Sequence, residues 1–385
     1  MAERLVTMIA HNIVSPLGLT SADNFAAVTA GRSAVRCHKN QWGLPEPFAA
    51  SLIDHEVVNE ACKAEGVGDG LTFFERMAVL SIKKALQECD VDITSEKTLV
   101  ILSTTKGNVD LLRVNDEHLP ANREYPGEAA KAICQALHYP NKPLVVSNAC
   151  VSGVCAQIEA YRQIKSGHYD VVVVCGADVL GPFIVSGFQS LKALSSDPCR
   201  PFDEDRTGIN LGDAAATCIF KGVKADEIES GSWILADGVI RNDAFHIASP
   251  AKNGEGCYRA LTQLLHHVDK DDLACINAHG TATLFNDEME AVALTRAGLS
   301  DIPVNSLKGY FGHTLGAAGV LETIITMLAV EQGMVIGTRG FKNLGVSRPI
   351  KVSAQHEKTD KSTFIKMLSG FGGCNAALLY RRFSR

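Results

Sequence analysis

The sequence lacks the features that would place it in several large classes of protein. No apolar run approaches the roughly 18 residues needed to cross a bilayer, so we expect no membrane span. The cysteines include no pair separated by two residues, the spacing typical of zinc sites. Lysine and arginine number 37 against 43 acidic residues and form no basic cluster, which argues against a nucleic-acid partner. The first residues place an acid and a histidine around a short apolar run, unlike a secretory signal.

The composition is that of a compact globular protein. The 385 residues include 46% hydrophobic and 21% charged residues, which is enough to bury a large core, and the length exceeds that of one ordinary domain. The twelve cysteines are irregularly spaced in a long chain, which indicates reduced thiols rather than a disulfide framework. We therefore expect a cytoplasmic protein.

Apolar strands alternate with amphipathic helices along the chain. Residues 73–90 have helical spacing, and residues 97–103 and 170–177 read as strands too apolar to have a solvated face. This pattern predicts the α/β class, with a mostly parallel sheet covered on both sides.

Segments in the first part of the chain resemble segments in the second part. Residues 145–153 (VVSNACVSG) and 304–316 (VNSLKGYFGHTLG) each lead into a helix, and residues 212–220 and 373–380 are similar small-residue strands that follow. We predict two related halves, 1–230 and 231–385; chance similarity between two strand-helix units is the alternative.

Cys150 is the first candidate for chemistry. It follows the apolar residues 143–147, which predict a buried strand, and precedes the amphipathic segment 155–164. Backbone N–H groups at a helix start favour an anion, so we expect a lowered pKa and a nucleophilic thiolate. A buried structural cysteine is the alternative reading.

Three further segments are rich in glycine and polar groups. His279 follows a predicted strand and is a candidate acid or base, or else a structural histidine. Lys308 and His313 precede a helix that carries Glu322, so an ion pair between the lysine and this glutamate is the simplest interpretation. Residues 370–373 (GFGG) can present backbone N–H groups, or form a plain turn.

In this order, the four segments resemble those of the elongating β-ketoacyl-acyl-carrier-protein synthases. Residues 199–208, 241–250 and 316–322 match the same family, so the resemblance covers nearly the whole chain. It implies the thiolase fold, with two βαβαβαββ halves related by a pseudo-twofold axis in five αβαβα layers. It also implies a dimer of two like chains or a ketosynthase heterodimer, and a site without metal or organic cofactor.

The resemblance implies a decarboxylating condensation in fatty acid or polyene/polyketide elongation. Cys150 would take an acyl group from an acyl carrier protein, the N–H donors of His279 and His313 would stabilise the malonyl-derived enolate, and the backbone N–H groups of Cys150 and Phe371 would hold the oxyanion. Phe371 would also gate the site. Residues that would support the site or bind the pantetheine and acyl groups are Lys308, Glu322, Gly370, Gly372, Thr281, Thr283, Phe188 and Lys106.

The sequence departs from the family pattern at several positions. Asn148 and Cys374 stand where threonine is usual, and residues 284–286 (LFN) replace small residues beside the pantetheine channel. Lys106 stands where an apolar side chain commonly lines the acyl pocket, which argues against an ordinary long fatty acyl chain unless this lysine points to solvent.

Two other functions fit the same fold. A chain-length-factor-like subunit would bind without condensing, but such subunits typically lack the nucleophilic cysteine. A thiolase or an initiating synthase would carry asparagine or a second cysteine in place of one histidine. The presence of Cys150, His279 and His313 argues against the chain-length-factor-like subunit, and the segment from Lys308 to His313 argues against the thiolase and the initiating synthase.

Overall fold

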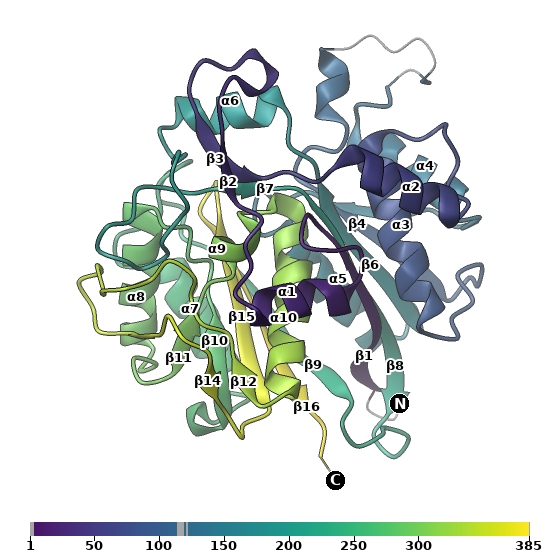
Figure 1. Ribbon diagram of the computed structural model, residues 1–385. Helices are drawn as coiled ribbons and strands as arrows, with labels where there is room; N and C mark the ends of the chain where they lie inside the picture. Colours follow the sequence, from purple (N-terminus) through teal and green to yellow (C-terminus); the bar gives the residue numbers. More distant parts are fainter. Residues whose placement is uncertain (1–3, 114–118, 121, 385) are drawn as a thin grey trace.

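The computed structural model describes residues 4–113, 119–120 and 122–384. This part of the chain forms an 11-stranded mixed sheet, and two smaller sheets lie outside it (Figure 1). Helices cover both faces of the strands, so the predicted α/β class is confirmed.

The N-terminal half of the sheet contains five strands. In order across the sheet they are β5 (Leu144–Val146), β4 (Thr98–Ser103), β6 (Val171–Asp178), β8 (Ala214–Lys224) and β1 (Arg4–Val14). If these five strands are numbered by their order in the sequence, their arrangement across the sheet is 3-2-4-5-1.

The C-terminal half repeats this order and adds one edge strand. From the meeting point outward its strands are β9 (Trp233–Asn242), β16 (Cys374–Arg382), β15 (Thr363–Gly370), β10 (Leu273–Asn277), β11 (Pro303–Asn305) and the edge strand β13 (Lys351–Val352). The halves join where β1 pairs antiparallel with β9. Because the topology repeats, the segments after β5 and β11 occupy equivalent places, as do those after β4 and β10. The boundary at residue 230 stays a prediction.

The helices form a central layer and two outer layers. Figure 1 shows α10 in the middle of the molecule, with α3 on one side and α7 and α8 on the other. The central helices, which contact strands of both halves, are α5 (Ser152–Lys165) and α10 (Ala318–Glu331). The outer helices are α2 (His55–Ala64), α3 (Phe73–Gln87) and α4 (Pro126–Ala136) on the N-terminal half, and α7 (Glu255–Leu264) and α8 (Leu284–Arg296) on the C-terminal half.

The remaining elements are short. The helices are α1 (Ser21–Thr29), α6 (Pro182–Ser190) and α9 (Lys308–Phe311). The strands of the smaller sheets are β2 (Arg36–His38), β3 (Phe48–Ser51), β7 (Leu211–Gly212), β12 (Met334–Val335) and β14 (Glu357–Lys358).

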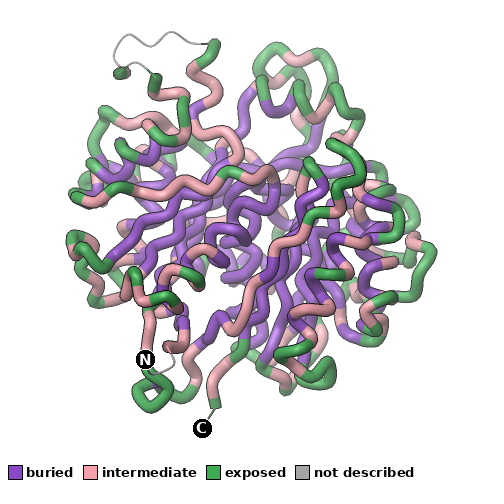
Figure 2. Tube along the Cα trace, turned by 180° about the vertical axis from the view of Figure 1, so that it is seen from behind, coloured by how far each residue is buried: buried purple, intermediate pink, exposed green. Residues whose placement is uncertain are grey.

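The hydrophobic core follows the layers. One cluster of buried side chains joins α5 and α10 to the strands, a second lies under α3 and α4, and a third lies under α7 and α8. Figure 2 shows these buried residues through the centre of the molecule and the exposed residues on peripheral loops. The central cluster fixes α5, which follows Cys150, against α10, which follows His313.

Two glycines allow α5 and α10 to touch. A Cβ atom at Gly153 would lie 2.8 Å from the carbonyl oxygen of Gly316, and one at Gly319 would lie 2.4 Å from the backbone nitrogen of Val154. A side chain at either position would force the helices apart. The close approach therefore holds the starts of the two helices together.

Two expectations about the strands are wrong. The sheet is not mostly parallel, because five of its ten neighbouring pairs are antiparallel. Short turns such as the one between β15 and β16 can join only antiparallel neighbours, and the sequence pattern of buried strands does not reveal their direction. The strand before Cys150 is half-buried rather than buried, because β5 lies at the edge of the sheet and pairs only with β4 among the described residues.

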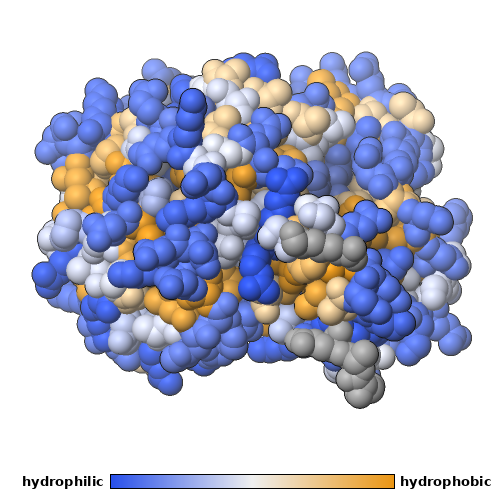
Figure 3. Space-filling view, turned by 90° about the horizontal axis from the view of Figure 1, so that it is seen from below, coloured by the Kyte–Doolittle hydropathy of each residue, from blue (hydrophilic) through white to orange (hydrophobic). Residues whose placement is uncertain are grey.

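The face of the molecule seen from below is largely hydrophilic. Seen from below, charged and polar side chains cover most of the molecule, with smaller hydrophobic patches between them (Figure 3). Among the described residues, no helix is both long and apolar enough to cross a membrane.

Candidate active site

Cys150 lies in the short connection between β5 and α5. The preceding residue, Ala149, has a φ of 45°, a left-handed conformation that is uncommon for a residue with a side chain. The turn is closed by a hydrogen bond from the Val151 N–H to the Asn148 carbonyl oxygen at 3.2 Å. Strain of this kind persists where the surrounding structure imposes it, and here it fixes the position of the Cys150 thiol.

His279 follows β10 and is held through its backbone. Its N–H and that of Gly280 each donate to a carboxylate oxygen of Glu290 at 2.7 Å, while the Thr281 N–H donates to Asp287 at 3.0 Å. Burial raises the pKa of Glu290 to about 7 and that of Asp287 to about 6. We missed both acids in the sequence; their spacing on α8, one turn apart and facing the loop, was the available signal.

His313 follows α9 and is also placed by a backbone constraint. Gly312 has a φ of 68°, and a Cβ atom there would lie 2.2 Å from the Leu211 carbonyl oxygen, so only glycine fits. The His313 N–H donates to the Asn210 carbonyl oxygen at 2.7 Å. The segment between β11 and α10 is thereby fastened to the N-terminal half of the chain.

These three side chains meet at one point. The Sγ atom of Cys150 and a ring nitrogen of each histidine all lie within 4.8 Å of one another, and the two imidazole centroids are 5.1 Å apart. His279 Nδ1 and both ring nitrogens of His313 are buried without a hydrogen-bond partner in the described part of the chain. Buried polar atoms are rarely left unpaired, so these nitrogens are available to a ligand.

Both imidazoles are neutral. Burial lowers the pKa of His279 and of His313 well below the ordinary value, and the charge of Lys308 lowers both further. A neutral imidazole has one N–H donor and one lone pair. The three side chains could also hold a soft metal ion by geometry, but the nearby ammonium group of Lys308 opposes a cation there.

The expected lowering of the Cys150 pKa is wrong. Burial raises the pKa of this thiol to about 11, although the charges of Lys106 and Lys308 and the backbone N–H of Phe371 act in the opposite direction. The expectation weighed the helix start and omitted desolvation, which disfavours a thiolate in a buried pocket. In this structure Cys150 therefore rests as a thiol.

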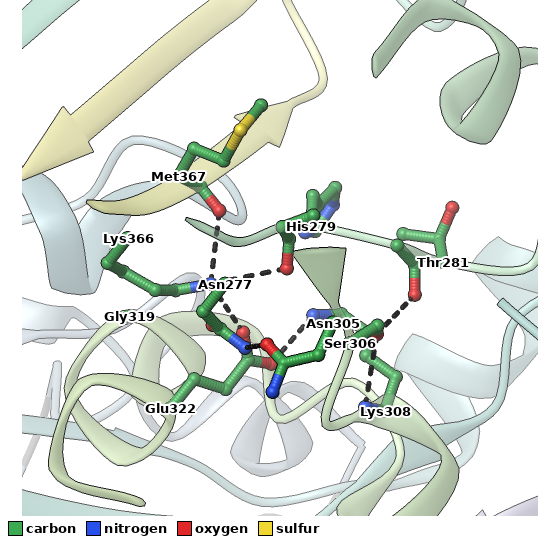
Figure 4. Close-up of polar contacts among 12 residues, drawn as sticks. Asn277, His279, Thr281, Asn305, Ser306, Lys308, Gly319, Glu322, Lys366 and Met367 are labelled. Atoms are coloured by element: carbon green, nitrogen blue, oxygen red, sulfur yellow. Dashed lines mark hydrogen bonds and ion pairs between the residues drawn. The ribbon is translucent and has the colours of Figure 1, made fainter. Parts of the chain in front are cut away.

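The predicted ion pair between Lys308 and Glu322 is present, and a second lysine joins it. Lys308 Nζ lies 2.7 Å from Glu322 Oε1, and Lys366 Nζ lies 2.6 Å from Oε2. Figure 4 shows Lys366 between Glu322 and the carbonyl of Met367. Burial lowers the pKa of Lys366 to about 8, whereas the two lysines keep the pKa of Glu322 below its usual value despite its burial.

Lys366 was missed in the sequence. It is fully buried in β15, where its neighbours are apolar, so a lysine inside an otherwise apolar strand was the available signal. Its ammonium group also lies 3.4 Å from the carbonyl oxygen of Ala278, next to His279. The network thus links β15, α10 and the segments that carry both histidines.

The loop after β15 faces the nucleophile. The backbone N–H of Phe371 bonds to the Cys150 sulfur, as an oxyanion donor should. Gly370 packs against the Cys150 backbone, and Gly372 has a φ of 85°, so the turn requires glycine there. The Phe371 ring is 38% exposed and lies 5.9 Å from the Phe188 ring, centroid to centroid.

A cavity of about 490 Å³ leads to this group. Cys150, both histidines and Phe371 line it, and the Thr281 and Thr283 hydroxyls, 2.8 Å apart, lie along its wall. Residues 284–286 also line it, as expected for the channel. Of the candidate residues implied to touch substrate, Lys106 is the one outside this cavity.

Lys106 lies on another side of Cys150. It is half-buried, its ammonium group donates to Thr105 Oγ1, and its charge lowers the pKa of both Cys150 and His313. The loop after β4 is the topological equivalent of the His279 loop, which explains why it approaches the same centre. The ammonium group is therefore close enough for its charge to act on both Cys150 and His313.

Comparison with known protein families agrees with this geometry. Residues 6–225 match the family described as beta-ketoacyl synthase, N-terminal domain, and residues 233–342 match its C-terminal domain. The chain belongs to the β-ketoacyl synthase family. Its acyltransferase chemistry follows from this membership.

Several curated relatives of this β-ketoacyl synthase are named for the same reaction. It is 27% identical to 3-oxoacyl-[acyl-carrier-protein] synthase 2 of Vibrio cholerae, over 99% of this chain and 100% of the relative. It is 28% identical to the tetracenomycin polyketide synthase ketoacyl synthase alpha subunit of Streptomyces glaucescens, and the match covers 99% of this chain and 98% of the relative. It is 32% identical to a putative mitochondrial 3-oxoacyl-[acyl-carrier-protein] synthase of Schizosaccharomyces pombe, and this match covers 62% of this chain and 61% of the relative.

Solved structures share the fold. A beta-ketoacyl synthase from Burkholderia phymatum superposes with a TM-score of 0.86 at 24% identity, covering 99% of this chain and 100% of that one. The ishigamide ketosynthase/chain length factor gives 0.84 at 23% identity, covering 100% of both chains. The predicted thiolase fold is confirmed.

Proposed function

We propose that this β-ketoacyl synthase joins an acyl group held on Cys150 to a two-carbon unit from malonyl-acyl carrier protein, in fatty acid or polyene/polyketide elongation. The meeting of Cys150, His279 and His313 within 4.8 Å of one another, at the end of a cavity, carries the proposal. The complete set argues against a non-condensing subunit and against a thiolase-type acyltransferase.

The first half-reaction transfers the acyl group. The Cys150 sulfur attacks the thioester carbon, the bond to the pantetheine sulfur breaks, and the thiol proton leaves with the pantetheine thiol. The oxyanion that forms is held by the backbone N–H groups of Cys150 and Phe371. Lys106 and Lys308 favour the thiolate during attack because their charges lower the pKa of Cys150.

The second half-reaction makes the carbon–carbon bond. Loss of carbon dioxide from the malonyl group leaves an enolate, whose oxygen accepts hydrogen bonds from the N–H groups of His279 and His313. The enolate carbon attacks the acyl carbon on Cys150, and the sulfur leaves as thiolate. The imidazoles are neutral, and among the described residues neither ring nitrogen of His313 nor Nδ1 of His279 has a hydrogen-bond partner that would compete for the enolate.

Partners and location are part of the proposal. Carrier proteins are expected because the curated relatives are named for acyl-carrier-protein substrates. We infer no metal or organic cofactor, with substrates arriving on the phosphopantetheine arm. Each of the twelve cysteines is free, as expected for a reducing cytoplasm.

Acyl transfer to Cys150 is tested by intact-protein mass spectrometry with a panel of acyl-carrier proteins. The wild type should gain the mass of one acyl group, Cys150→Ala should gain none, and Cys275→Ala, at another buried cysteine, should behave as the wild type. Acylation of Cys150→Ala, or failure of every acyl-carrier protein to load the wild type, would contradict the proposal.

The acyl group is proposed to be short, polar or conjugated. The preference rests on Lys106, which is half-buried and whose charge lowers the pKa of Cys150. A long saturated chain laid over its ammonium group would leave a charge without solvent. We expect Lys106→Ile to extend loading toward longer saturated chains, and Lys142→Ile, at an exposed lysine, to change nothing. Efficient loading of long saturated chains by the wild type would refute this preference.

A further inference from the structure

Two cysteines that the condensation does not use lie together behind the nucleophile. Cys155 is in the first turn of α5 and Cys374 is the first residue of β16. Their sulfur atoms are joined by a hydrogen bond. The Asn148 amide group reaches both, with Nδ2 3.2 Å from Cys374 Sγ and 3.6 Å from Cys155 Sγ. The three side chains form a thiol cluster, by which we mean Asn148, Cys155 and Cys374.

The two sulfurs are unequal. The hydrogen bond from the Cys155 thiol lowers the pKa of Cys374, and the Asn148 amide acts in the same direction. The same hydrogen bond raises the pKa of Cys155, as does burial. Cys374 is therefore the more nucleophilic sulfur, and Cys155 keeps its proton beside it.

The thiol cluster lies behind the wall of the active-site cavity. Both cysteines are buried, at 6% and 7% exposure, but Gly373 and Asn375, on either side of Cys374, line the cavity. Cys150 lines it as well, whereas Cys155 and Cys374 are one residue layer behind its wall. A small, neutral oxidant can enter this cavity, where a protein thiol cannot.

We propose that Cys374 and Cys155 form a peroxide-reactive dithiol site, in which a hydroperoxide converts the two thiols into a disulfide between α5 and β16. The Cys374 sulfur attacks the outer peroxide oxygen, the O–O bond breaks, and the alcohol or water leaves, giving a sulfenic acid. The Cys155 sulfur then attacks this sulfur and displaces water. Two thiols and one hydroperoxide give one disulfide, one alcohol and one water, so atoms and electrons balance.

The disulfide would act on the loop that holds the oxyanion donor. Gly370 pairs with Cys374 across the turn from β15 to β16, and Phe371 between them bonds through its N–H to Cys150. Drawing Cys374 toward α5 moves one end of this turn. Oxidation should therefore slow condensation, and reduction should restore it. The slowing of condensation rests on the proposed function, whereas formation of the disulfide does not.

The bond itself is tested in the full-length Cys150→Ser variant, in which the nucleophile cannot be oxidised. After hydrogen peroxide treatment, non-reducing peptide mapping should show a peptide joined through residues 155 and 374, which a thiol reductant removes. Cys374→Thr and Cys155→Ala should each lack the joined peptide, and Cys275→Ala should retain it. Oxidation of Cys374 without the link, or no reaction at either cysteine in a folded protein, would overturn the proposal.

The effect on catalysis is tested with Cys150 protected by its own acyl group. Acyl-loaded wild type is treated with peroxide, and its single-turnover condensation with malonyl-carrier protein is measured. A several-fold loss that a thiol reductant reverses is expected, with no loss in Cys374→Thr. An equal loss in both proteins would refute the effect. Failure of untreated wild type to load would count against the proposed function instead.

Discussion

At the residue scale, the site is a set of uncharged groups kept next to charged ones. Burial raises the pKa of Cys150 and lowers those of His279 and His313, so the three reacting groups rest in their neutral forms. The charge is carried by Lys308 and Lys366, and the single carboxylate of Glu322 offsets only one of these two positive charges. Negative charge that develops during the reaction thus meets donors and positive potential already in place.

The two histidines should be separable from the cysteine by partial reactions. His279→Ala and His313→Ala should each lower malonyl decarboxylation by roughly 10²–10³-fold, because each removes one donor from the enolate. Acyl transfer to Cys150 should persist in part, since its oxyanion uses backbone N–H groups. Decarboxylation is followed by release of carbon dioxide, and acyl transfer by intact mass.

His168→Ala is the matched control, because His168 is exposed and distant in sequence from every site segment. It should leave both partial reactions unchanged. Normal decarboxylation in both active-site variants would show that the enolate is stabilised elsewhere.

At the element scale, the contact between α5 and α10 sets the distance between the nucleophile and His313. The helix α5 begins at Ser152, two residues after Cys150, and α10 begins at Ala318, five residues after His313. Their backbones meet at Gly153 and Gly319. Such contact leaves no room for a methyl group. The catalytic spacing is therefore a property of two helices and is not held by the side chains alone.

Gly319→Ala should consequently impair activity more than stability. The new methyl group would meet the backbone of Val154 at 2.4 Å, and relief of this overlap costs about 1–3 kcal/mol of unfolding free energy. Because the helices must separate, we expect a loss of condensation activity of at least tenfold in protein that remains folded. Urea unfolding and condensation rates measure the two effects.

The control is Gly127→Ala in α4, where a Cβ atom would meet nothing within 4 Å. Alanine favours a helix over glycine by about 1 kcal/mol, so this variant should be as stable as the wild type or slightly more so. If Gly319→Ala kept full activity, the helix contact would not set the catalytic geometry.

At the scale of the whole molecule, the central sheet ends at an incomplete edge. The strand β5 pairs with β4 on one side, and its three apolar residues are half-buried in the chain as described. Unpaired strand edges of this kind commonly pair with another chain. We expect a second copy to pair along β5, which agrees with the dimer implied by the family resemblance.

Light scattering should accordingly give twice the chain mass of 41.2 kDa. Ser147→Arg, at the exposed residue after β5, should weaken the dimer because like charges from the two copies would approach each other. Ser166→Arg, at an exposed residue after α5, is the control and should remain dimeric. A wild type that is monomeric when alone would contradict a homodimer, and a heterodimer with a chain-length-factor-like partner would then be the assembly to seek.

The sequence by itself determined the chemistry and the class of fold. The glycine-rich segments after apolar strands made Cys150, His279 and His313 candidates, but each local pattern also fitted a structural residue. The order of the segments along the chain, which resembles that of the β-ketoacyl synthases, assigned their roles. The pairing of Lys308 with Glu322 could be expected because the helix after Lys308 carries this glutamate. Strand and helix positions followed from hydrophobic periodicity.

Tertiary structure alone decided the protonation states, the strand directions and the remaining partners. The pKa of Cys150 depends on desolvation by residues distant in sequence, which outweighs the local helix start. Lys366 joins Glu322, and Cys374 joins Cys155, only because β15 and β16 are packed against α10 and α5. The sequence pattern of a helix or strand shows which of its faces is apolar. These interactions depend instead on which other helix or strand packs against that face.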